Sequence, residues 1–304
     1  MKIKTIGGAV AERMERYPLV MLVIGILGIA MSSIFVKFSQ APAAVTAAYR
    51  MLWTVLLMTP VVLGKKAVRR ELVQLDKKTL LLSLVSGGFL AAHFVLWFES
   101  LNHTSVASST TIVCTEVIWV ALGFCLFLKG RITAKAVAAI AVTVGGSVLI
   151  ALSDSGAGGN YLYGDLLALA AAMVEAVYTL IGTTVRKRTS TAVYTYVVYG
   201  ACAGCLLVTC LVQGLSLFAY GFSAPVVGLL LAVFSTILGH SIFTWCLKFF
   251  SPSFVSASKL CEPVVAAIVA MFLFYEFPAP VQILGSLLIL GGVFYYSRLE
   301  QKKA

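Results

Sequence analysis

Seven ionisable residues lie inside apolar runs of this 304-residue chain, and they are the residues whose chemistry most needs an explanation. They are Arg50, His93, Glu116, Glu175, His240, Lys259 and Glu262. A charge at the centre of a bilayer costs about 2.5–3.5 kcal/mol on insertion scales, so such residues pair with one another, face water or act on a ligand. Their spacing therefore bears directly on what the protein does.

Two of the acids, Glu116 and Glu175, are candidates for binding a cationic group or carrying a proton. Each has an aromatic residue three positions later, Trp119 and Tyr178. Residues three apart share a helix face, and an acid beside an aromatic ring suits an ammonium group. The alternatives are structural: Glu116 as a partner of Lys259 or Arg50, and Glu175 as a neutral, hydrogen-bonded acid.

Lys259 and Glu262 are also three residues apart, which allows an ion pair within one helix. Alternatively, Lys259 binds a carboxylate or phosphate of a ligand. Pro263 follows Glu262 and removes a backbone N–H, so Glu262 is interpreted as partly structural and ranked below the other charged residues.

His93 and His240 titrate near neutral pH and are candidates for proton relay; the alternative is a hydrogen bond to a backbone carbonyl where helices cross. Trp97 and Trp245 join Trp119 and Tyr178 as expected walls of a binding cavity. The sequence shows no cluster of His, Cys, Asp and Glu at metal-ligand spacing, and we expect neither a metal nor a cofactor.

Several of these features occur twice. Glu116 and the pair Gly145-Gly146 recur 146 residues later as Glu262 and Gly291-Gly292, whereas His93 recurs 147 residues later as His240. Such internal symmetry is typical of a carrier built from two repeats. The glycine pairs predict close helix approach.

The composition requires elements that cross a membrane. Sixty per cent of the residues are hydrophobic and only 12% are charged, against about 25% in soluble domains. The net charge of +11 is spread over short loops, so nucleic-acid binding is rejected. Ten apolar runs are long enough to span: 18–38, 43–63, 80–99, 105–128, 134–152, 163–185, 193–213, 224–247, 254–274 and 280–297.

Basic residues set the expected orientation. With the N-terminus in the cytoplasm, 20 of the 23 Lys and Arg residues fall in cytoplasmic segments, which predicts N-in and C-in. Five spans separate each feature from its copy, so the second half is expected to be inverted. The expected segments are a cytoplasmic segment (1–17), a first repeat (18–152), an extracytoplasmic linker (153–162), a second repeat (163–297) and a cytoplasmic tail (298–304).

At this point the motifs themselves resemble a known family. Residues 93–109 read HFVLWFESLNHTSVASS, residues 239–245 read GHSIFTW, and residues 256–264 read SASKLCEPV. Together with Tyr275-Glu276 and Arg50, they resemble helices two, three, four, eight and nine of EamA-type carriers of the drug/metabolite transporter superfamily. The resemblance covers the whole chain.

The resemblance implies an all-α fold of ten transmembrane helices in two five-helix repeats. It also implies a cavity between helices 1, 3, 4, 6, 8 and 9, with helices 5 and 10 packing or forming a homodimer. The chain departs from the family pattern at Glu99, Glu116, Glu175 and Gly130-Arg131. Three of these departures add acids, which argues against a generic hydrophobic-drug site.

We therefore expect a secondary transporter of the cytoplasmic membrane rather than an enzyme. Its cargo would be a small polar or amphipathic metabolite such as an amino acid or organic amine, exported or exchanged by alternating access with proton coupling. One alternative is an organic-anion or sugar-phosphate exchanger that uses Arg50 and Lys259. Alternatives of another class are a lipid enzyme and a non-transporting scaffold.

Overall fold

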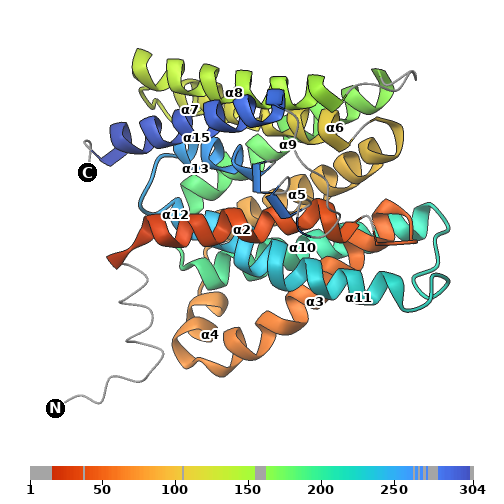
Figure 1. Cartoon of the computed structure of the whole chain (residues 1–304). Helices are drawn as coiled ribbons and strands as arrows, with labels where there is room; N and C mark the ends of the chain where they lie inside the picture. The colour runs from red at the N-terminus through yellow and green to blue at the C-terminus, as the bar shows by residue number, and fades with distance from the viewer. Residues whose placement is uncertain are drawn as a thin grey trace.

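The computed structural model shows a bundle of helices that run roughly side by side (Figure 1). It describes residues 16–36, 38–104, 106–154, 162–262, 264–265, 268–269, 272 and 280–301. The first half contains α2 (Pro18–Val36), α3 (Ala43–Gly64), α4 (Lys66–Val73), α5 (Lys77–His103), α6 (Val106–Cys114), α7 (Glu116–Phe127) and α8 (Ala134–Asp154). The second half contains α9 (Leu162–Val185), α10 (Thr191–Val212), α11 (Ser223–Leu230), the π-helix η1 (Leu231–His240), α12 (Ser241–Cys246), α13 (Pro252–Lys259) and α15 (Pro280–Gln301).

Six helical segments of the described chain are long and apolar enough to cross a membrane. They are Pro18–Val36, Ala43–Gly64, Lys77–His103, Leu162–Val185, Thr191–Val212 and Ser223–Cys246. These six confirm the corresponding predicted spans. The predicted span 105–128 is divided into α6 and α7. Seven residues of the predicted span 254–274 (263, 266, 267, 270, 271, 273 and 274) lie outside the described residues, as do residues 155–161 of the linker and 1–15 of the N-terminal segment.

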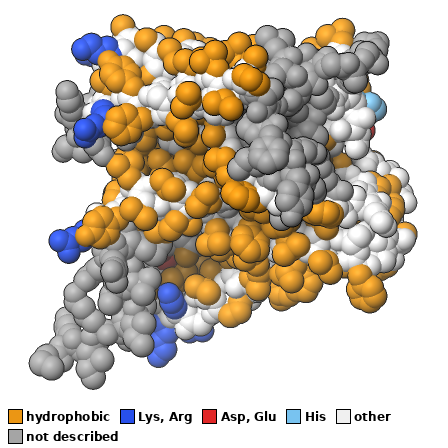
Figure 2. Space-filling model, viewed as in Figure 1, with side chains coloured by type: hydrophobic (Ala, Val, Ile, Leu, Met, Phe, Trp, Pro, Cys, Tyr) orange, Lys and Arg blue, Asp and Glu red, His pale blue; other side chains and the backbone are white. Residues whose placement is uncertain are grey.

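The surface agrees with a membrane environment. Figure 2 shows hydrophobic side chains over most of the visible face, with Lys and Arg gathered at the end where α2 begins and α15 ends. Leu126, Leu211 and Phe294 are among the large apolar side chains that remain exposed. Apolar patches of this extent are rare on soluble monomers and mark contact with lipid or another protein.

Side chains at the helix starts fix the entry of several helices. Asp76 precedes α5 and accepts a hydrogen bond from the Thr79 backbone N–H at 2.9 Å. The Thr79 side chain and backbone N–H both donate to Asp76, which lowers the pKa of that carboxyl below its ordinary value. Ser251 caps α13 through the Phe254 N–H, and Pro252 occupies the first turn, where its missing N–H costs nothing.

The backbone itself repeats. Helices α11, α13 and α15 begin 146 residues after α5, α6 and α8, the same offset as between the two acids. The packing follows the repeat: α5 lies against α9 and α2 against η1, while α3 pairs with α10, α7 with α13 and α8 with α15. Exchanging the two halves maps the α5–α9 and α2–η1 pairs onto each other and the α3–α10 and α8–α15 pairs onto themselves, as a pseudo-two-fold axis requires.

The histidines depart from the common offset because of η1. A π-helix closes its hydrogen bonds over five residues instead of four and so holds one extra residue in a turn. His240 is the last residue of η1, and its offset from His93 is 147. The offset is 146 again where α13 begins.

Helix α4 was not predicted, because a scan for long apolar runs passes over an amphipathic helix of eight residues. None of its described residues is buried. Glu71 Oε1 accepts a hydrogen bond from the Ser190 N–H at 2.6 Å, which holds α4 against the start of α10.

The predicted glycine pairs are half correct. Helices α8 and α15 pack together, and a Cβ at Gly146 would lie 2.6 Å from the Gly285 carbonyl oxygen. A Cβ at Gly292 would collide with Thr143, whereas a Cβ at Gly145 or Gly291 would meet no neighbour among the described residues. Whether the outer faces of α8 and α15 also form a homodimer stays a prediction.

The adjacent glycines provide a matched stability test. We expect Gly146→Ala to lower the melting temperature of the purified protein, because overpacking costs about 1–3 kcal/mol. Gly145→Ala should leave it unchanged or raise it, since alanine favours helix by about 1 kcal/mol over glycine. Equal melting temperatures for the two variants would contradict the close approach of α8 and α15.

Candidate functional site

Two interrupted helices bring the repeated acids into the bundle. Thr115 forms a turn between α6 and α7, and Glu116 is the first residue of α7. At the matching place in the second half, Leu260 and Cys261 form a turn after α13, and Glu262 is the next helical residue. Broken helices at membrane depth are tolerated where they line a cavity, and in carriers they mark the binding site.

Lys259 joins the acids Glu116 and Glu175. Its Nζ lies 2.9 Å from Glu116 Oε2 and 2.7 Å from Glu175 Oε1, and all three side chains are buried. The ion pair between Lys259 and Glu262 that their spacing allowed is not formed among the described residues. Lys259 ends α13 and directs its ammonium group to α7 and α9 instead. Glu116 thus has Lys259 as its partner, as in the structural interpretation of this acid from the sequence.

Further hydrogen bonds complete this ionic cluster. Glu116 Oε1 accepts from Thr179 Oγ1 at 2.8 Å and from Ser256 Oγ at 3.1 Å. Glu175 Oε2 lies 3.5 Å from His93 Nδ1, which is also 3.2 Å from the Ala171 carbonyl oxygen. Burying charges is tolerable only with such dense pairing, because low dielectric makes an uncompensated charge costly.

Arg50 is held differently from Lys259. It is fully buried, its Nε donates to Thr236 Oγ1 at 2.8 Å, and its guanidinium carbon lies 4.3 Å from the centre of the Phe94 ring. Neither Nη1 nor Nη2 has a hydrogen-bond partner among the described residues. The same is true of the buried Oε1 of Glu262 within the part of the chain that the structure describes.

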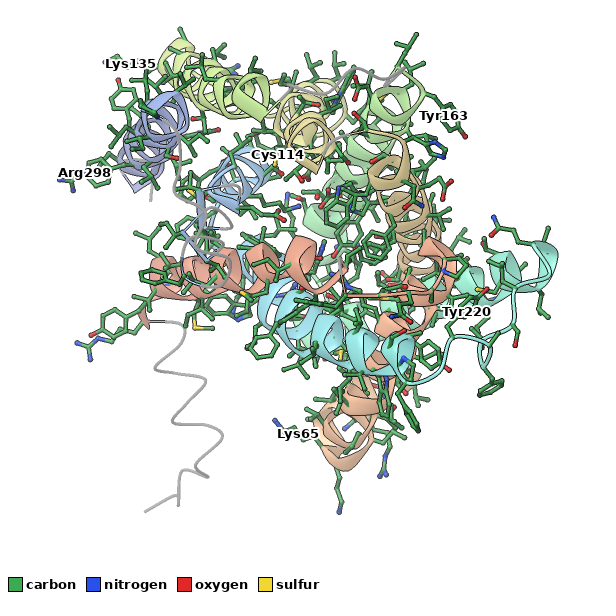
Figure 3. The ribbon with its side chains drawn as sticks, turned by 45° about the vertical axis from the view of Figure 1, so that its right-hand side comes forward. Lys65, Cys114, Lys135, Tyr163, Tyr220 and Arg298 are labelled. Carbon is green, nitrogen blue, oxygen red and sulfur yellow. The ribbon has the colours of Figure 1, made fainter. Side chains whose placement is uncertain are left out.

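These groups line one cavity of about 40 Å³ between the two halves. Its lining comprises Ile29, Ser32, Arg50, His93, Trp97, Thr110, Val113, Cys114, Glu116, Glu175, Ser235, His240, Lys259 and Glu262. Figure 3 shows Cys114 inside the bundle, with Lys135 and Arg298 at its edge. The volume has room for a few water molecules.

The structure brings seven of the ten predicted site residues into this lining. They are Arg50, His93, Trp97, Glu116, Glu175, His240 and Lys259. Among these, Trp97 stacks on His93 at a ring distance of 5.9 Å, and His240 meets Phe94 edge-on at 5.7 Å.

The other three predicted site residues lie outside the lining. The Tyr178 hydroxyl is 3.0 Å from Thr244 Oγ1, and Trp245 packs on Phe249 at 4.5 Å. Trp119 has a buried Nε1 without a partner in the described chain. Glu99, one of the three acids by which the chain departs from the family pattern, is half-exposed at the end of α5 and pairs with His103 at 3.1 Å.

Several lining residues were missed or underrated from sequence. Glu262 was ranked low, although its repeat relation to Glu116 was the signal that predicted its position. The hydroxyl residues Ser32, Thr110 and Ser235 also line the cavity, and each has a buried oxygen with no partner among the described residues. A single hydroxyl in an apolar helix carries no signal that separates it from a packing residue.

The cavity has the chemistry of a charged binding site. Two basic side chains, three acidic side chains and two histidines line it. Within the described residues, no group of three His, Cys, Asp or Glu side chains is arranged to hold a metal ion. The wall of the cavity is therefore rich in ionisable groups.

Comparisons with known proteins agree with this architecture. The model of the EamA-like transporter family matches residues 12–152 and 162–298, one copy in each half. Among 29 matching solved chains, one titled only as the crystal structure of a protein has a TM-score of 0.76 at 17% identity, covering 94% of this chain and 98% of its own. That likeness shows the fold alone. The search of curated proteins found no match.

The ionic cluster makes a testable prediction about stability. Lys259→Met should lower the melting temperature strongly, because removing one partner of a buried pair costs about 3–5 kcal/mol. Adding Glu116→Gln should recover part of the loss, since one fewer carboxylate is left uncompensated. Lys135→Met, at an exposed lysine, is the control. A Lys259→Met variant as stable as the wild type would contradict the ionic cluster.

Proposed function

This chain belongs to the EamA-like transporter family, and on that premise we propose that it moves a small polar or amphipathic metabolite across the membrane by alternating access. The family is one of drug/metabolite transporters and not of enzymes, so the chain is a multi-pass membrane protein with a small-molecule substrate. The proposed cargo is an amino acid or an organic amine, exported or exchanged.

The observation that carries the proposal is the charged cavity between the halves. Arg50, His93 and Glu116 come from the first half, and Glu175 and Lys259 from the second. A cavity of about 40 Å³ is far below the 300–1,000 Å³ of typical ligand pockets, so a metabolite requires the halves to separate. A site at the interface of two repeats that rock against each other meets this requirement.

The proposed topology has ten spans, with the two five-helix repeats (18–152 and 163–297) inverted relative to each other. The common offset of the helix starts and the symmetric packing pairs support this arrangement. The gathering of basic side chains at the end where α2 begins and α15 ends supports N-in and C-in orientation in a cytoplasmic membrane (Figure 2). The segment 153–162 then faces the outside.

Proton coupling is proposed to act through Glu116. Its bridge to Lys259 joins α7 of the first half to α13 of the second. A proton on Glu116 would remove the charge that holds Lys259, which weakens the connection between the halves and favours their separation. His93 and His240 line the same cavity and are the proposed relay.

The coupling can be measured in reconstituted vesicles. With a panel of labelled amino acids and amines, we expect an imposed pH gradient to accelerate wild-type flux. Glu116→Gln should still exchange cargo but lose the response to the gradient, because glutamine takes up no proton. Glu99→Gln removes a half-exposed acid outside the cavity and should behave as wild type.

A Glu116→Gln variant that keeps normal flux and the full response to the gradient would refute the coupling role of Glu116. Absence of flux for every compound, by a protein that binds ligand and is correctly folded, would instead refute the transport function itself.

A further inference from the structure

A second pocket opens at the edge of the bundle, beside α4. Its volume of about 490 Å³ lies within the 300–1,000 Å³ of typical ligand pockets. The first half lines it with α4 and the start of α5, and the second half lines it with the residues that follow α9. Figure 1 places α4 toward the end of the bundle where α2 begins, and Figure 3 shows Lys65, just before α4, well away from Cys114 of the central cavity.

Two arginines line this pocket, one from each half. Arg70 belongs to α4, and Arg188 follows α9. Both side chains are exposed, and no ion pair joins either of them to an acid among the described residues. A guanidinium group keeps its charge throughout the physiological pH range and can bind a phosphate group through two parallel hydrogen bonds. The pocket thus presents two permanent cations to a ligand.

The two acids in the lining already have hydrogen-bond donors. Glu71 Oε1 accepts from the Ser190 N–H at 2.6 Å. Asp76 accepts from the Thr79 N–H at 2.9 Å and, through its second oxygen, from the Thr79 hydroxyl at 2.5 Å. Six further basic residues lie on the same segments of the chain: Lys65, Lys66, Arg69, Lys77, Lys78 and Lys187. The electrostatic potential around the pocket therefore favours an anion.

The part of the wall that carries Arg188 is held on both sides. Buried Arg186 donates through Nε to the Thr244 carbonyl oxygen and through Nη1 to the Thr189 carbonyl oxygen. Ser190 then caps α10. The backbone of Arg188 is consequently positioned before a ligand arrives, which reduces the ordering cost of binding.

Exposed apolar side chains border the same segments. Four large ones are Leu63 near the end of α3, Val73 at the end of α4, and Leu80 and Leu81 on α5. A polar pocket beside exposed apolar side chains fits a phospholipid, whose headgroup enters the pocket while its acyl chains cover the apolar helices. Inorganic phosphate would leave this apolar surface uncovered.

We propose that this pocket binds the headgroup phosphate of an anionic phospholipid through Arg70 and Arg188. The assignment rests on the proposed function and its N-in orientation, which places α4 at the cytoplasmic leaflet. Basic pockets on that side of membrane proteins bind anionic headgroups, because the leaflet carries a negative surface potential. The bound headgroup contacts both halves beside the hydrogen bond from Ser190 to Glu71, so it stabilises the arrangement in which the halves are joined at this end.

Short-chain lipids test the assignment on the purified full-length protein. The melting temperature would be followed while dioctanoyl phosphatidylglycerol is added to the detergent micelles, with dioctanoyl phosphatidylcholine as the zwitterionic reference of equal chain length. A ligand that binds only the folded state raises the melting temperature as its concentration rises. We expect phosphatidylglycerol to reach half of its full effect at a concentration at least fivefold lower than phosphatidylcholine.

Two pairs of neighbouring basic residues supply matched variants. Arg70→Gln and Arg188→Gln each remove an arginine of the lining and should raise the half-effect concentration of phosphatidylglycerol at least fivefold. Arg69→Gln and Lys187→Gln remove adjacent charges outside the lining and should change it less than twofold. All four side chains are exposed, so the substitutions leave the buried contacts in place.

Equal losses in all four variants would overturn the proposal, because they would indicate a general attraction of anionic lipid to a basic surface. An equal response to sn-glycerol 3-phosphate and to phosphatidylglycerol would also overturn it, since the pocket would then recognise soluble phosphate instead of a lipid. Vesicle flux separates this result from the proposed function. Flux without any response to phosphatidylglycerol would leave transport standing and refute the lipid site, whereas absence of flux in every vesicle would refute transport.

Discussion

The contact of Lys259 with Glu116 and Glu175 is the interaction on which the rest of the site depends. One ammonium group at the end of α13 satisfies a carboxylate on α7 and another on α9, so it links the two halves at the depth of the cavity. Without it two buried carboxylates would face each other uncompensated. Turns lie directly before Glu116 and after Lys259, and both residues line the small cavity.

The scaffold is nearly symmetric, but the charges on it are not. Lys259 and Glu175 occupy the positions of Val113 and Ile29 in the first half, and both of those apolar residues also line the cavity. The repeated acids consequently have different surroundings: Glu116 is held by three donors, whereas Glu262 keeps a buried oxygen without a partner in the described chain. The π-helix η1 adds a further difference, and its Thr236 accepts a hydrogen bond from Arg50 Nε. A repeated backbone thus supports different surroundings for the two repeated acids.

Much of this could be predicted from the sequence, because apolar run length and repeated residues report directly on membrane helices. Six spans, the two-fold repeat and the set of buried charges were predicted in this way, and seven predicted site residues line the cavity. The partners of each charge could not be predicted, since spacing along one helix favoured Lys259–Glu262 while the turn after α13 directs Lys259 across the interface. Trp119, Tyr178 and Trp245 lie outside the lining; the Tyr178 hydroxyl lies within hydrogen-bond distance of Thr244 Oγ1, and Trp245 packs on Phe249. The sign of the π-helix in the sequence is that His93 and His240 are 147 residues apart, one more than the 146 residues between the repeated acids.

We propose that the bridge from Glu116 to Lys259 holds the halves closed over the cavity. The alkylation rate of Ser235→Cys, at a fully buried lining residue on η1, measures this closure in a protein whose seven native cysteines are replaced. We expect slow alkylation by a small maleimide, and a rate at least several-fold faster when Glu116→Gln is added, because the ionic link between the halves is lost. An unchanged rate, in variants of equal melting temperature, would show that the bridge does not hold the halves closed.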